Sequence, residues 1–502
     1  MFVNTFWSLV PPIVAIGLAL LTKETYSSLF IGIVVGALLA TDFSPIGALD
    51  TIINDGLTAA IADNAGIFLF LVILGVMVAL VNATGGSAAF GRWAASHIHS
   101  KAGALLATFA LGVLIFIDDY FNCLTVGSVM TPVTDSQKIS RVKLAYLIDA
   151  TAAPICMIAP ISSWAAAVSG VAAKLDTGVS GIQLFIEAIP YNFYSLLTIV
   201  FVITMVVLGV DYGPMAAAEL KAAQTGDLGA LSEEQEEGSS RANMWDMLIP
   251  IFLLIIFCVI GLIYVGGFWD PETNAGDFIA AFGDTDAFVG LPWGALIALV
   301  LSIIYLCARR VITFKGAMGC MTKGFNAMVP AILILTFAVS LKSMTGLLGA
   351  ADYVEGLMVH AAEGLFMLLP AIIFVVACLL AFATGTSWGT FGILIPIVLP
   401  IFNAAPDLQI MGISACLAGA VCGDHCSPIS DTTIMASAGA NCNHIDHVST
   451  QIPYAVTVAA ICFVNYILAA FIRNVVISLA IGVVMVIGTL LVIRSVQSRK
   501  TA

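Results

Sequence analysis

Residues 423–433 read Gly-Asp-His-Cys-Ser-Pro-Ile-Ser-Asp-Thr-Thr and place two carboxylates, an imidazole and four hydroxyl groups inside an otherwise apolar segment. A charged side chain costs roughly 2.5–3.5 kcal/mol at the centre of a membrane helix on insertion scales, so this cluster is a functional-site hypothesis. The surrounding sequence has a second copy, because residues 129–162 match residues 397–430 without a gap and align Pro160 with Pro428. A repeat with polar breaks in both copies is typical of secondary transporters.

The composition indicates an all-α membrane protein with many spans. The chain has 502 residues, of which 60% are hydrophobic and 10% charged, whereas soluble domains carry about 25% charged residues. Its length allows about a dozen helical spans of roughly 20 residues each. Residues 1–20 lack the basic segment that begins a cleaved signal peptide, so we interpret them as part of the first span. The net charge of −13 gives no indication of a nucleic-acid partner.

The cysteines predict neither a disulfide framework nor a metal centre. All eleven are scattered, mostly through apolar runs, which indicates packing within the membrane. A metal site at Cys422, His425 and Cys426 is disfavoured, because the spacing is not a standard one and no second Cys/His pair lies nearby. No cofactor is expected.

Long apolar runs predict about eleven membrane-spanning helices, because only helices or closed barrels satisfy the backbone in lipid and these runs are too long for barrel strands. The predicted spans are residues 6–22, 27–41, 66–82, 143–172, 184–210, 247–266, 291–308, 326–344, 410–440, 452–472 and 476–493. Lys and Arg concentrate on alternate connections, which the positive-inside rule places in the cytoplasm. The alternation requires two further apolar stretches, 102–135 and 366–404, to be re-entrant hairpins. The chain then lies in the cell (inner) membrane with its N-terminus outside and its C-terminus in the cytoplasm, apart from the exceptions Lys174 and Arg473.

The two copies acquire opposite orientations in this topology and form an inverted repeat, which supports alternating access. The predicted organisation is N-terminal scaffold helices at 1–65, repeat 1 at 66–210, a flexible acidic cytoplasmic linker at 211–246, scaffold helices at 247–325, repeat 2 at 326–472, and a C-terminal helix and tail at 473–502. Each repeat contains one hairpin and one broken helix, at 143–172 in repeat 1 and at 410–440 in repeat 2.

Both predicted hairpins carry oxygen ligands. Hairpin one has adjacent carboxylates, Asp118 and Asp119, which repel each other in an apolar segment and are expected to hold a proton or a cation. Alternatively, they cap a helix at the membrane surface. Hairpin two has Thr384, Thr386 and Ser387, whose hydroxyls suit a dehydrated Na+ ion; alternatively, they form the turn of a buried hairpin without a ligand.

Prolines break the two repeat helices and free backbone carbonyls at mid-membrane. Repeat 2 is the more ionisable, because Asp424 and Asp431 align with Cys156 and Ser163 of repeat 1. We therefore expect repeat 2 to carry the main ion or proton site and repeat 1 to support it. The alternative is a proline kink whose hydroxyls only satisfy the backbone. The candidate ion- or substrate-binding residues are Asp118, Asp119, Asn122, Asp149, Thr151, Ser162, Ser163, Thr384, Thr386, Ser387, Asp424, His425, Ser427, Ser430, Asp431, Thr432 and Thr433.

Ionisable residues also occur near the predicted ends of the spans. His444 and His447 follow at the cytoplasmic end, where they are weak candidates for pH sensing or belong to a plain solvated loop. Lys342 and Glu187 lie near outer ends, where they could pair, or Lys342 could neutralise a substrate carboxylate. A lysine whose amine extends to the interface is the favoured interpretation.

Residues 423–455 (GDHCSPISDTTIMASAGANCNHIDHVSTQIPYA) and 116–128 (FIDDYFNCLTVGS) resemble the NhaC family of Na+/H+ antiporters, within the larger ion-transporter superfamily. The likeness runs over most of the chain. Similar proteins include Na+-linked exchangers of malate and lactate and carriers of amino acids. The resemblance implies a fold in which two hairpins and two broken helices surround a central site, and a homodimer formed through scaffold helices.

The favoured function is Na+/H+ antiport by alternating access, in which Na+ and H+ compete for Asp424 and Asp431 while Asp118 and Asp119 face them. The alternative within transport is Na+-coupled movement of an amino acid or small organic acid, whose carboxylate helix N-termini would hold. An intramembrane aspartyl protease fits poorly, because Val421 stands where that motif needs a glycine. A channel fits poorly as well, because hairpins of opposite sense favour alternating access. We therefore expect a transporter and not an enzyme.

Overall fold

The computed structural model describes residues 2–22, 24–116, 119–159, 162, 164–165, 168, 181–231, 241–350, 352–353, 366–402 and 406–501. Within these ranges every regular element is a helix, and the β pairing is confined to an isolated bridge between Ala230 and Cys442. The prediction of an all-α membrane protein is confirmed.

Two helical hairpins lie at corresponding places in the two sequence copies. The first consists of α7 (Lys101–Leu114) and α8 (Asp119–Ser136), and the second of α20 (Leu369–Thr384) and α21 (Ser387–Ile401). The helices of each hairpin pack against each other. The second helices begin at Asp119 and Ser387, which the ungapped match aligns, so the two copies change direction at equivalent residues.

Each hairpin is followed by an interrupted helix. In the first copy α9 (Arg141–Thr151) ends at Ala152, which leaves helical geometry with φ −85° and ψ −99°, and α10 (Ala153–Cys156) follows. In the second copy α22 (Pro406–Cys426) and α23 (Asp431–Gly439) are bent by 48° across residues 427–430. Ser430 caps α23, because its side chain accepts a hydrogen bond from the Thr433 backbone N–H.

The remaining helices surround these two copies. Before the first hairpin come η1 (Phe6–Leu9), α1 (Val10–Thr22), α2 (Thr25–Ala40), α3 (Pro45–Thr51), the π-helix η2 (Ile52–Thr58), α4 (Ala59–Asp63), α5 (Ala65–Thr84) and α6 (Gly86–His97). Between and after the copies come α12 (Gly181–Ala188), η3 (Ile189–Tyr191), α13 (Phe193–Leu208), α14 (Gly213–Thr225), α15 (Trp245–Val265), α16 (Phe278–Gly283), α17 (Ala287–Ala308), α18 (Phe314–Leu347), η4 (Phe366–Leu368), α24 (His444–Ile472) and α25 (Val475–Thr501).

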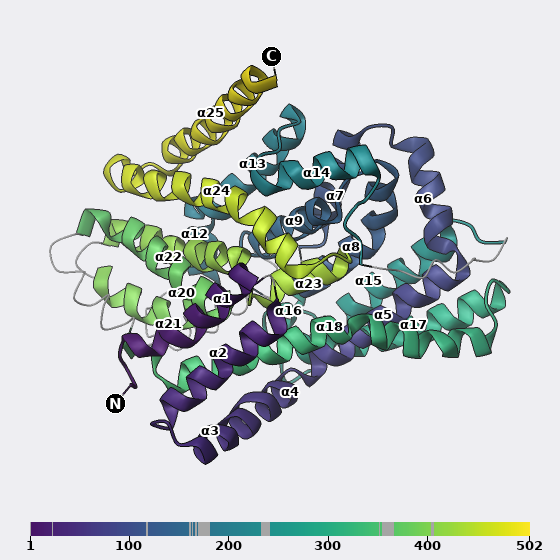
Figure 1. Cartoon of the computed structure of the whole chain (residues 1–502), viewed down its shortest axis with the longest axis horizontal. Coiled ribbons are helices and arrows are strands. Elements are labelled where there is room, and N and C mark those ends of the chain that lie inside the picture. Colours follow the sequence, from purple (N-terminus) through teal and green to yellow (C-terminus); the bar gives the residue numbers. More distant parts are fainter. Residues whose placement is uncertain are drawn as a thin grey trace.

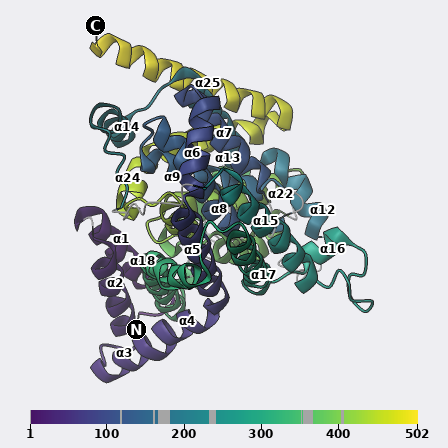
Figure 2. The same cartoon turned by 90° about the vertical axis from the view of Figure 1, so that its right-hand side faces the viewer.

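The short helix α23 lies at the centre of the molecule (Figure 1), where it packs against α8 and α9 of the first copy and against α18, α22 and α24. On one side of it α5, α15, α17 and α18 form a bundle, and on the other α20, α21 and α22 pack together. In both views α25 and α3 lie at opposite ends of the molecule (Figures 1 and 2). Segments from both copies therefore meet at α23.

The number of about eleven spans stays a prediction. Within the described residues five helices are long and apolar enough to cross a membrane, and the number rises to seven if each of two bent pairs is one span. The predicted span 184–210 is one of these pairs, because the chain bends by 48° between Gln183–Tyr191 and Phe193–Leu208. The acidic connection expected at 42–65 is itself mostly helical, through α3, η2 and α4.

The first part of the connection between the two copies is docked on the protein and not flexible as expected. Residues 213–225 form α14, and the backbone N–H of Arg141 donates to Leu228 O at 2.8 Å. Glu219 is buried and accepts from Ser140 N at 2.8 Å, at the start of α9. The apolar and hydrogen-bonded face of α14 explains the difference, since a helix that buries such a face stays in place. The Glu-rich residues 233–237 lie outside the described residues.

Candidate functional site

The tip of the second hairpin packs directly on the break between α22 and α23. Gly385 ends α20 with φ +64°, and a Cβ atom there would lie 2.4 Å from Ile429 O. Gly423 allows a similarly close contact between α22 and α20, because a Cβ atom at this position would lie 2.0 Å from Cys378 O. Both positions therefore require glycine for space, and this packing brings the hairpin tip to Asp424.

Asp424 is buried and is held by the second hairpin. The Ser387 hydroxyl donates to Asp424 Oδ2 at 2.7 Å, and the Ser387 backbone N–H donates to the same oxygen at 3.2 Å. The carboxylate thus sits at the N-terminus of α21, where the helix dipole favours negative charge. Its other oxygen, Oδ1, has no hydrogen-bond partner in the described part of the protein. One oxygen fixes the side chain, and the other is available to a cation or a proton.

The hydroxyls of the break mainly satisfy the backbone. The Ser427 hydroxyl donates to Phe382 O at 2.7 Å, and the Ser430 and Thr432 hydroxyls lie 3.0 Å apart. The Thr433 hydroxyl points back to Asp424 O at 3.5 Å. These contacts hold the interrupted backbone in place, and ion binding by these hydroxyls stays a prediction.

Asp431 is the first residue of α23 and is held by the first hairpin. The Tyr120 hydroxyl donates to Asp431 Oδ2 at 2.6 Å, and the Thr432 backbone N–H donates to Oδ1 at 2.8 Å. Lys342 of α18 lies within electrostatic range of this carboxylate, and its Cε lies near the hairpin residue Gly389. The two acidic residues of the break are therefore contacted from different hairpins.

The first hairpin is fastened to the broken helix of its own copy by Asn122. Its buried amide nitrogen donates to Gly112 O at 2.7 Å, Ile115 O at 2.9 Å and Thr151 O at 3.0 Å. The Thr151 hydroxyl donates to Leu147 O of its own helix at 2.8 Å. The amide nitrogen of Asn122 therefore holds α7, α8 and α9 together. Its Oδ1 has no hydrogen-bond partner in the described residues.

A second buried polar cluster lies beside the break. Asp149 of α9 accepts from Gln451 Nε2 at 2.8 Å, and its Oδ2 lies 3.2 Å from His447 Nε2. Gln451 Nε2 also donates to His425 O, which connects the cluster to the residue after Asp424. His425 Nδ1 lies 2.8 Å from the hydroxyl oxygen of Tyr194. Gln451 thus connects Asp149 to His425, and this cluster does not include the hairpin tips.

The histidines expected in a solvated loop are buried in α24. His444 places Nε2 at 2.8 Å from Pro428 O and Nδ1 at 2.9 Å from the Ser437 hydroxyl. His447 is fully buried against Asp149. The expectation of a solvated loop is wrong, because α24 starts at His444 and turns both rings inward. pH sensing by either histidine stays a prediction.

Some of the remaining candidate binding residues make local hydrogen bonds at helix ends and turns, and two lie outside the residues that the structure describes. Ser162 accepts from Ala165 N at 3.2 Å and donates to Cys156 O at 2.7 Å, so it caps a turn after α10. Thr384 bonds Leu380 O at 2.8 Å within α20, and Thr386 accepts from Gly389 N at 3.3 Å at the start of α21. Asp119 is buried and accepts from Tyr120 N at 3.1 Å. Asp118 and Ser163 lie outside the described residues.

Sequence reasoning did not identify Tyr120, Tyr194 or Gln451. Tyr120 directly follows the paired carboxylates of the first hairpin, which was a usable signal for a hydroxyl near the ion site. Gln451 follows His447 by four residues, a spacing that places both on one face of a helix. Tyr194 stands in an apolar run of α13 and carried no signal of this kind.

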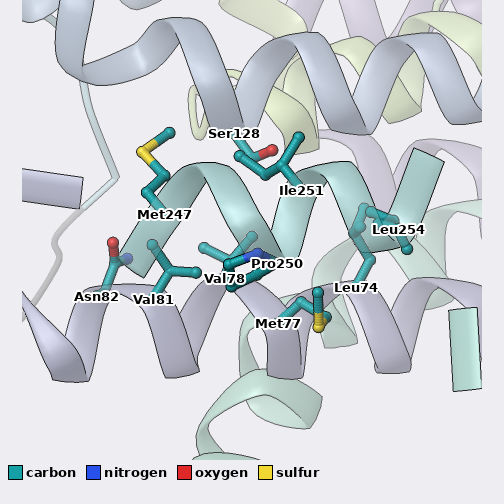
Figure 3. A pocket seen from close by; sticks show the side chains of 10 residues that line it. All are labelled: Leu74, Met77, Val78, Val81, Asn82, Ser128, Met247, Pro250, Ile251 and Leu254. Carbon is teal, nitrogen blue, oxygen red and sulfur yellow. The ribbon is translucent and has the colours of Figure 1, made fainter. Parts of the chain in front are cut away.

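Two other features of the structure bear on where an ion could bind. Among the described residues no group of three or more His, Cys, Asp or Glu side chains has an arrangement that could hold a metal ion. Figure 3 shows a pocket between α5, α8 and α15 with apolar side chains such as Leu74 and Leu254. Asn82 and Ser128 are its polar members. The pocket offers no charged ligand.

Comparison with known proteins identifies the family. The family model described as the Na+/H+ antiporter family matches residues 155–471. The chain belongs to this family. Over 486 residues it is 37% identical to an uncharacterized protein of Haemophilus influenzae, an alignment that covers 94% of this chain and 92% of that protein. The chain is thus a secondary transporter and a multi-pass membrane protein, as the sequence predicted.

More distant relatives are named as antiporters of organic solutes, one of them together with H+ and Na+. The chain is 26% identical over 201 residues to the malate-2H(+)/Na(+)-lactate antiporter of Bacillus subtilis, covering 39% of this chain and 42% of that protein. It is 26% identical over 239 residues to the arginine/ornithine antiporter ArcD of Halobacterium salinarum, covering 47% and 44%. Among solved structures, the YdaH transporter of Alcanivorax borkumensis is 14% identical with a TM-score of 0.37, covering 85% of this chain and 89% of that one.

Proposed function

We propose that this transporter exchanges Na+ for protons by alternating access, with Asp424 and Asp431 as the carboxylates for which the two ions compete. The observation that supports this most directly is the placement of the two side chains. They lie on either side of the break between α22 and α23, and each is hydrogen-bonded to a different hairpin, through Ser387 and Tyr120.

The chemistry of exchange follows from the cost of charge in a low-dielectric site. An ionised carboxylate away from water is stable only with a counter-charge, so either a proton or a cation must accompany it. Na+ is a hard cation that prefers oxygen ligands, and the free Oδ1 of Asp424 together with the carbonyls of the break offers them. Binding of Na+ therefore releases a proton, and binding of a proton releases Na+.

Alternating access would arise from movement of the hairpins relative to the break. Because the carboxylates are held by hairpins of the two copies, a displacement of one hairpin exposes the site to one side, and a displacement of the other exposes it to the opposite side. This requires the two copies to have opposite orientations in the membrane, with hairpins 102–135 and 366–404 entering from opposite faces. Repeats 66–210 and 326–472, connected through the segment 211–246 and the scaffold helices 247–325, are the proposed moving and supporting units.

The decisive experiment is a pH-dye assay on the full chain in proteoliposomes. After a Na+ pulse the wild type should move protons in the direction opposite to Na+, and Asp424→Asn and Asp431→Asn should abolish this movement. Asp63→Asn is the matched control, because Asp63 is an exposed carboxylate at the end of α4 and should leave exchange unchanged. Retention of Na+-dependent transport in the Asp424→Asn, Asp431→Asn double variant would rule out the proposed site.

A second candidate function is Na+-coupled transport of an amino acid or a small organic acid. The observation that favours it is the position of Lys342, whose side chain lies near the hairpin residue Gly389 and within electrostatic range of Asp431. An amine there is suited to a substrate carboxylate. Uptake of radiolabelled amino acids, malate and lactate with and without Na+ separates this function from pure ion exchange.

Orientation and assembly are also proposals. We place the N-terminus outside and the C-terminus in the cytoplasm of the inner membrane, and we propose a homodimer. Labelling of single cysteines introduced at Val3 and Ser498, in a variant without reactive native cysteines, by a membrane-impermeant reagent in intact cells tests the orientation. Light scattering of the purified protein tests the dimer.

A further inference from the structure

The cluster of Asp149, His425, His447 and Gln451 contains four buried polar atoms without a hydrogen-bond partner in the described residues. They are Asp149 Oδ1, His447 Nδ1, Gln451 Oε1 and His425 Nε2. All four side chains are at most 1% exposed. Buried polar groups are nearly always paired, so four orphaned atoms in one cluster mark a site that binds something.

The partnered atoms of the cluster define its hydrogen bonds. Gln451 Nε2 donates to Asp149 Oδ2 and to His425 O, which are both acceptors, so the orientation of the amide is determined. Asp149 Oδ2 also lies 3.2 Å from His447 Nε2, which must then be the donor nitrogen. The free positions are one carboxylate oxygen of Asp149 and the second ring nitrogen of His447. Either of them can hold a proton.

Charge balance requires that proton. In the described residues the ion-pair partner of Asp149 is His447, and no lysine or arginine forms an ion pair with it. The two cations on the same helix are engaged elsewhere, Arg141 with Asp135 and Lys143 with Asp211. A buried carboxylate without a counter-charge is costly, so the pair is stable when it carries one proton, on His447 Nδ1 or on Asp149 Oδ1.

We propose that Asp149 and His447 form a proton-binding site separate from the carboxylates that bind the cation. This proposal rests on the proposed Na+/H+ exchange, and it adds a second place where the transported or coupling proton is held. The proposed ligand is a proton, because the free positions are one carboxylate oxygen and one ring nitrogen of a buried pair without a lysine or arginine partner in the described residues.

The site is positioned to couple protonation to movement. Asp149 belongs to the broken helix of the first copy, whereas Gln451 connects it to the carbonyl of His425, the residue that follows Asp424 in the second copy. Loss or gain of charge on Asp149 changes its hydrogen bond with Gln451. The change is transmitted to the end of α22, where the cation site begins.

The ionisable groups that face the pair come from the elements around it. They are His425 and Asp424 from α22, His444 from α24 and Tyr146 from α9; behind them, Tyr454 of α24 is in ring contact with Tyr146, and Tyr194 of α13 is hydrogen-bonded to His425. On α14, Glu219 is paired with Lys101 near the start of α9. Among these groups Asp424 is the carboxylate whose ionisation opposes that of Asp149. Binding of a cation at Asp424 removes this opposition, which gives the two sites a physical reason to communicate.

The test measures the number of protons exchanged per Na+ from the imposed gradients at which net flux stops. Asp149→Asn and His447→Gln should each lower this ratio by about one proton, while the purified protein should still bind Na+, measured as its stabilisation against heating in NaCl. His99→Gln is the control, because His99 is exposed and should leave the ratio unchanged. An unchanged ratio in both variants, or a loss of Na+ binding of tenfold or more, would overturn the separate proton site.

A second measurement does not depend on Na+ exchange. The infrared difference spectrum between about pH 5 and pH 8 should contain a signal from the Asp149–His447 pair that persists in Asp424→Asn and disappears in Asp149→Asn. Absence of any Asp149-dependent signal contradicts the proton site. If the wild type shows the signal but does not move protons in response to Na+, the proposed exchange fails while proton binding stands.

Discussion

The hydroxyl of Tyr120, in the first hairpin, donates a 2.6 Å hydrogen bond to Asp431 Oδ2 at the start of α23. The two residues are 311 positions apart in the sequence. This bond connects the hairpin of one copy to the broken helix of the other, across the proposed cation site. A shift of either hairpin must therefore alter the environment of an acidic side chain, which is the property that alternating access needs.

Replacement of Tyr120 by Phe should weaken the competition of Na+ against protons. The hydroxyl stabilises the ionised form of Asp431, and a hydrogen bond to a charged group contributes about 1.5–3 kcal/mol. Without it the carboxyl holds its proton more tightly, so the Na+ concentration for half-maximal exchange should rise roughly tenfold. The effect should be largest at low pH, and the pH dependence of exchange should move to higher pH.

Sodium-dependent proton flux measured from pH 6 to 9 checks this prediction. Tyr264→Phe is the control, because Tyr264 is 53% exposed and lies on α15, away from the break. Equal Na+ dependence in Tyr120→Phe and the wild type would mean that the bond to Asp431 has no part in ion competition.

Replacement of Ser387 by Ala should impair Na+ binding more than replacement of Thr384 by Ala. The Ser387 hydroxyl is bonded to Asp424 Oδ2 at 2.7 Å, whereas the Thr384 hydroxyl bonds Leu380 O within its own helix. Loss of the Ser387 bond should weaken Na+ binding roughly tenfold, and Thr384→Ala should stay within about twofold of the wild type. Calorimetric titration of the purified variants with NaCl measures both, and the reverse order of effects would contradict this assignment of the two hydroxyls.

The sequence was sufficient to locate the main acidic residues but not their partners. Asp424 and Asp431 were identifiable because polar groups in a long apolar segment are expensive, and Ser387 because the repeat aligned it with Asp119. Tyr120 and Gln451 were not, since their contacts join residues more than 300 positions apart and depend on how helices pack. The bend within 184–210 and the docking of α14 were missed for the same reason, because hydropathy reports burial in lipid and not contacts between helices.

Substitution of Gly423 by Ala should destabilise the protein, although alanine favours helices over glycine by about 1 kcal/mol. The new methyl group would lie 2.0 Å from Cys378 O and 2.7 Å from Phe382 N, so α20 and α22 would have to separate. Such overpacking costs about 1–3 kcal/mol. Gly392→Ala is the control, because nothing lies within 4 Å of the corresponding position. Thermal unfolding in detergent should show a lower midpoint for Gly423→Ala alone; equal midpoints would show that the two helices can move apart without cost.

Substitution of Arg141 by Lys should lower stability because a lysine cannot reproduce the contacts of the guanidinium. Arg141 is buried and donates to both carboxylate oxygens of Asp135, at 2.8 and 2.9 Å, and to Ala440 O at 2.8 Å. It thus joins α8 and α9 of the first copy to the end of α23. Unsatisfied buried acceptors cost about 1–3 kcal/mol. Arg494→Lys, at an exposed position, should unfold like the wild type in the same assay, and an unaffected Arg141→Lys variant would contradict the proposed role of this contact.

Neutralisation of Lys342 distinguishes the two candidate functions. The positive charge of Lys342 lies within electrostatic range of Asp431 and so competes with a bound cation for the carboxylate. If the transporter exchanges only ions, Lys342→Gln should increase the affinity for Na+ by a few-fold at high pH, where protons do not compete for Asp431, and Lys342→Arg should restore the wild-type value. If Lys342 instead binds the carboxylate of an organic substrate, Lys342→Gln should abolish substrate uptake while Na+ binding to the purified protein remains. Parallel measurements of Na+ binding and of radiolabelled malate, lactate and amino-acid uptake separate these outcomes, because a charge that only repels Na+ cannot be required for transport.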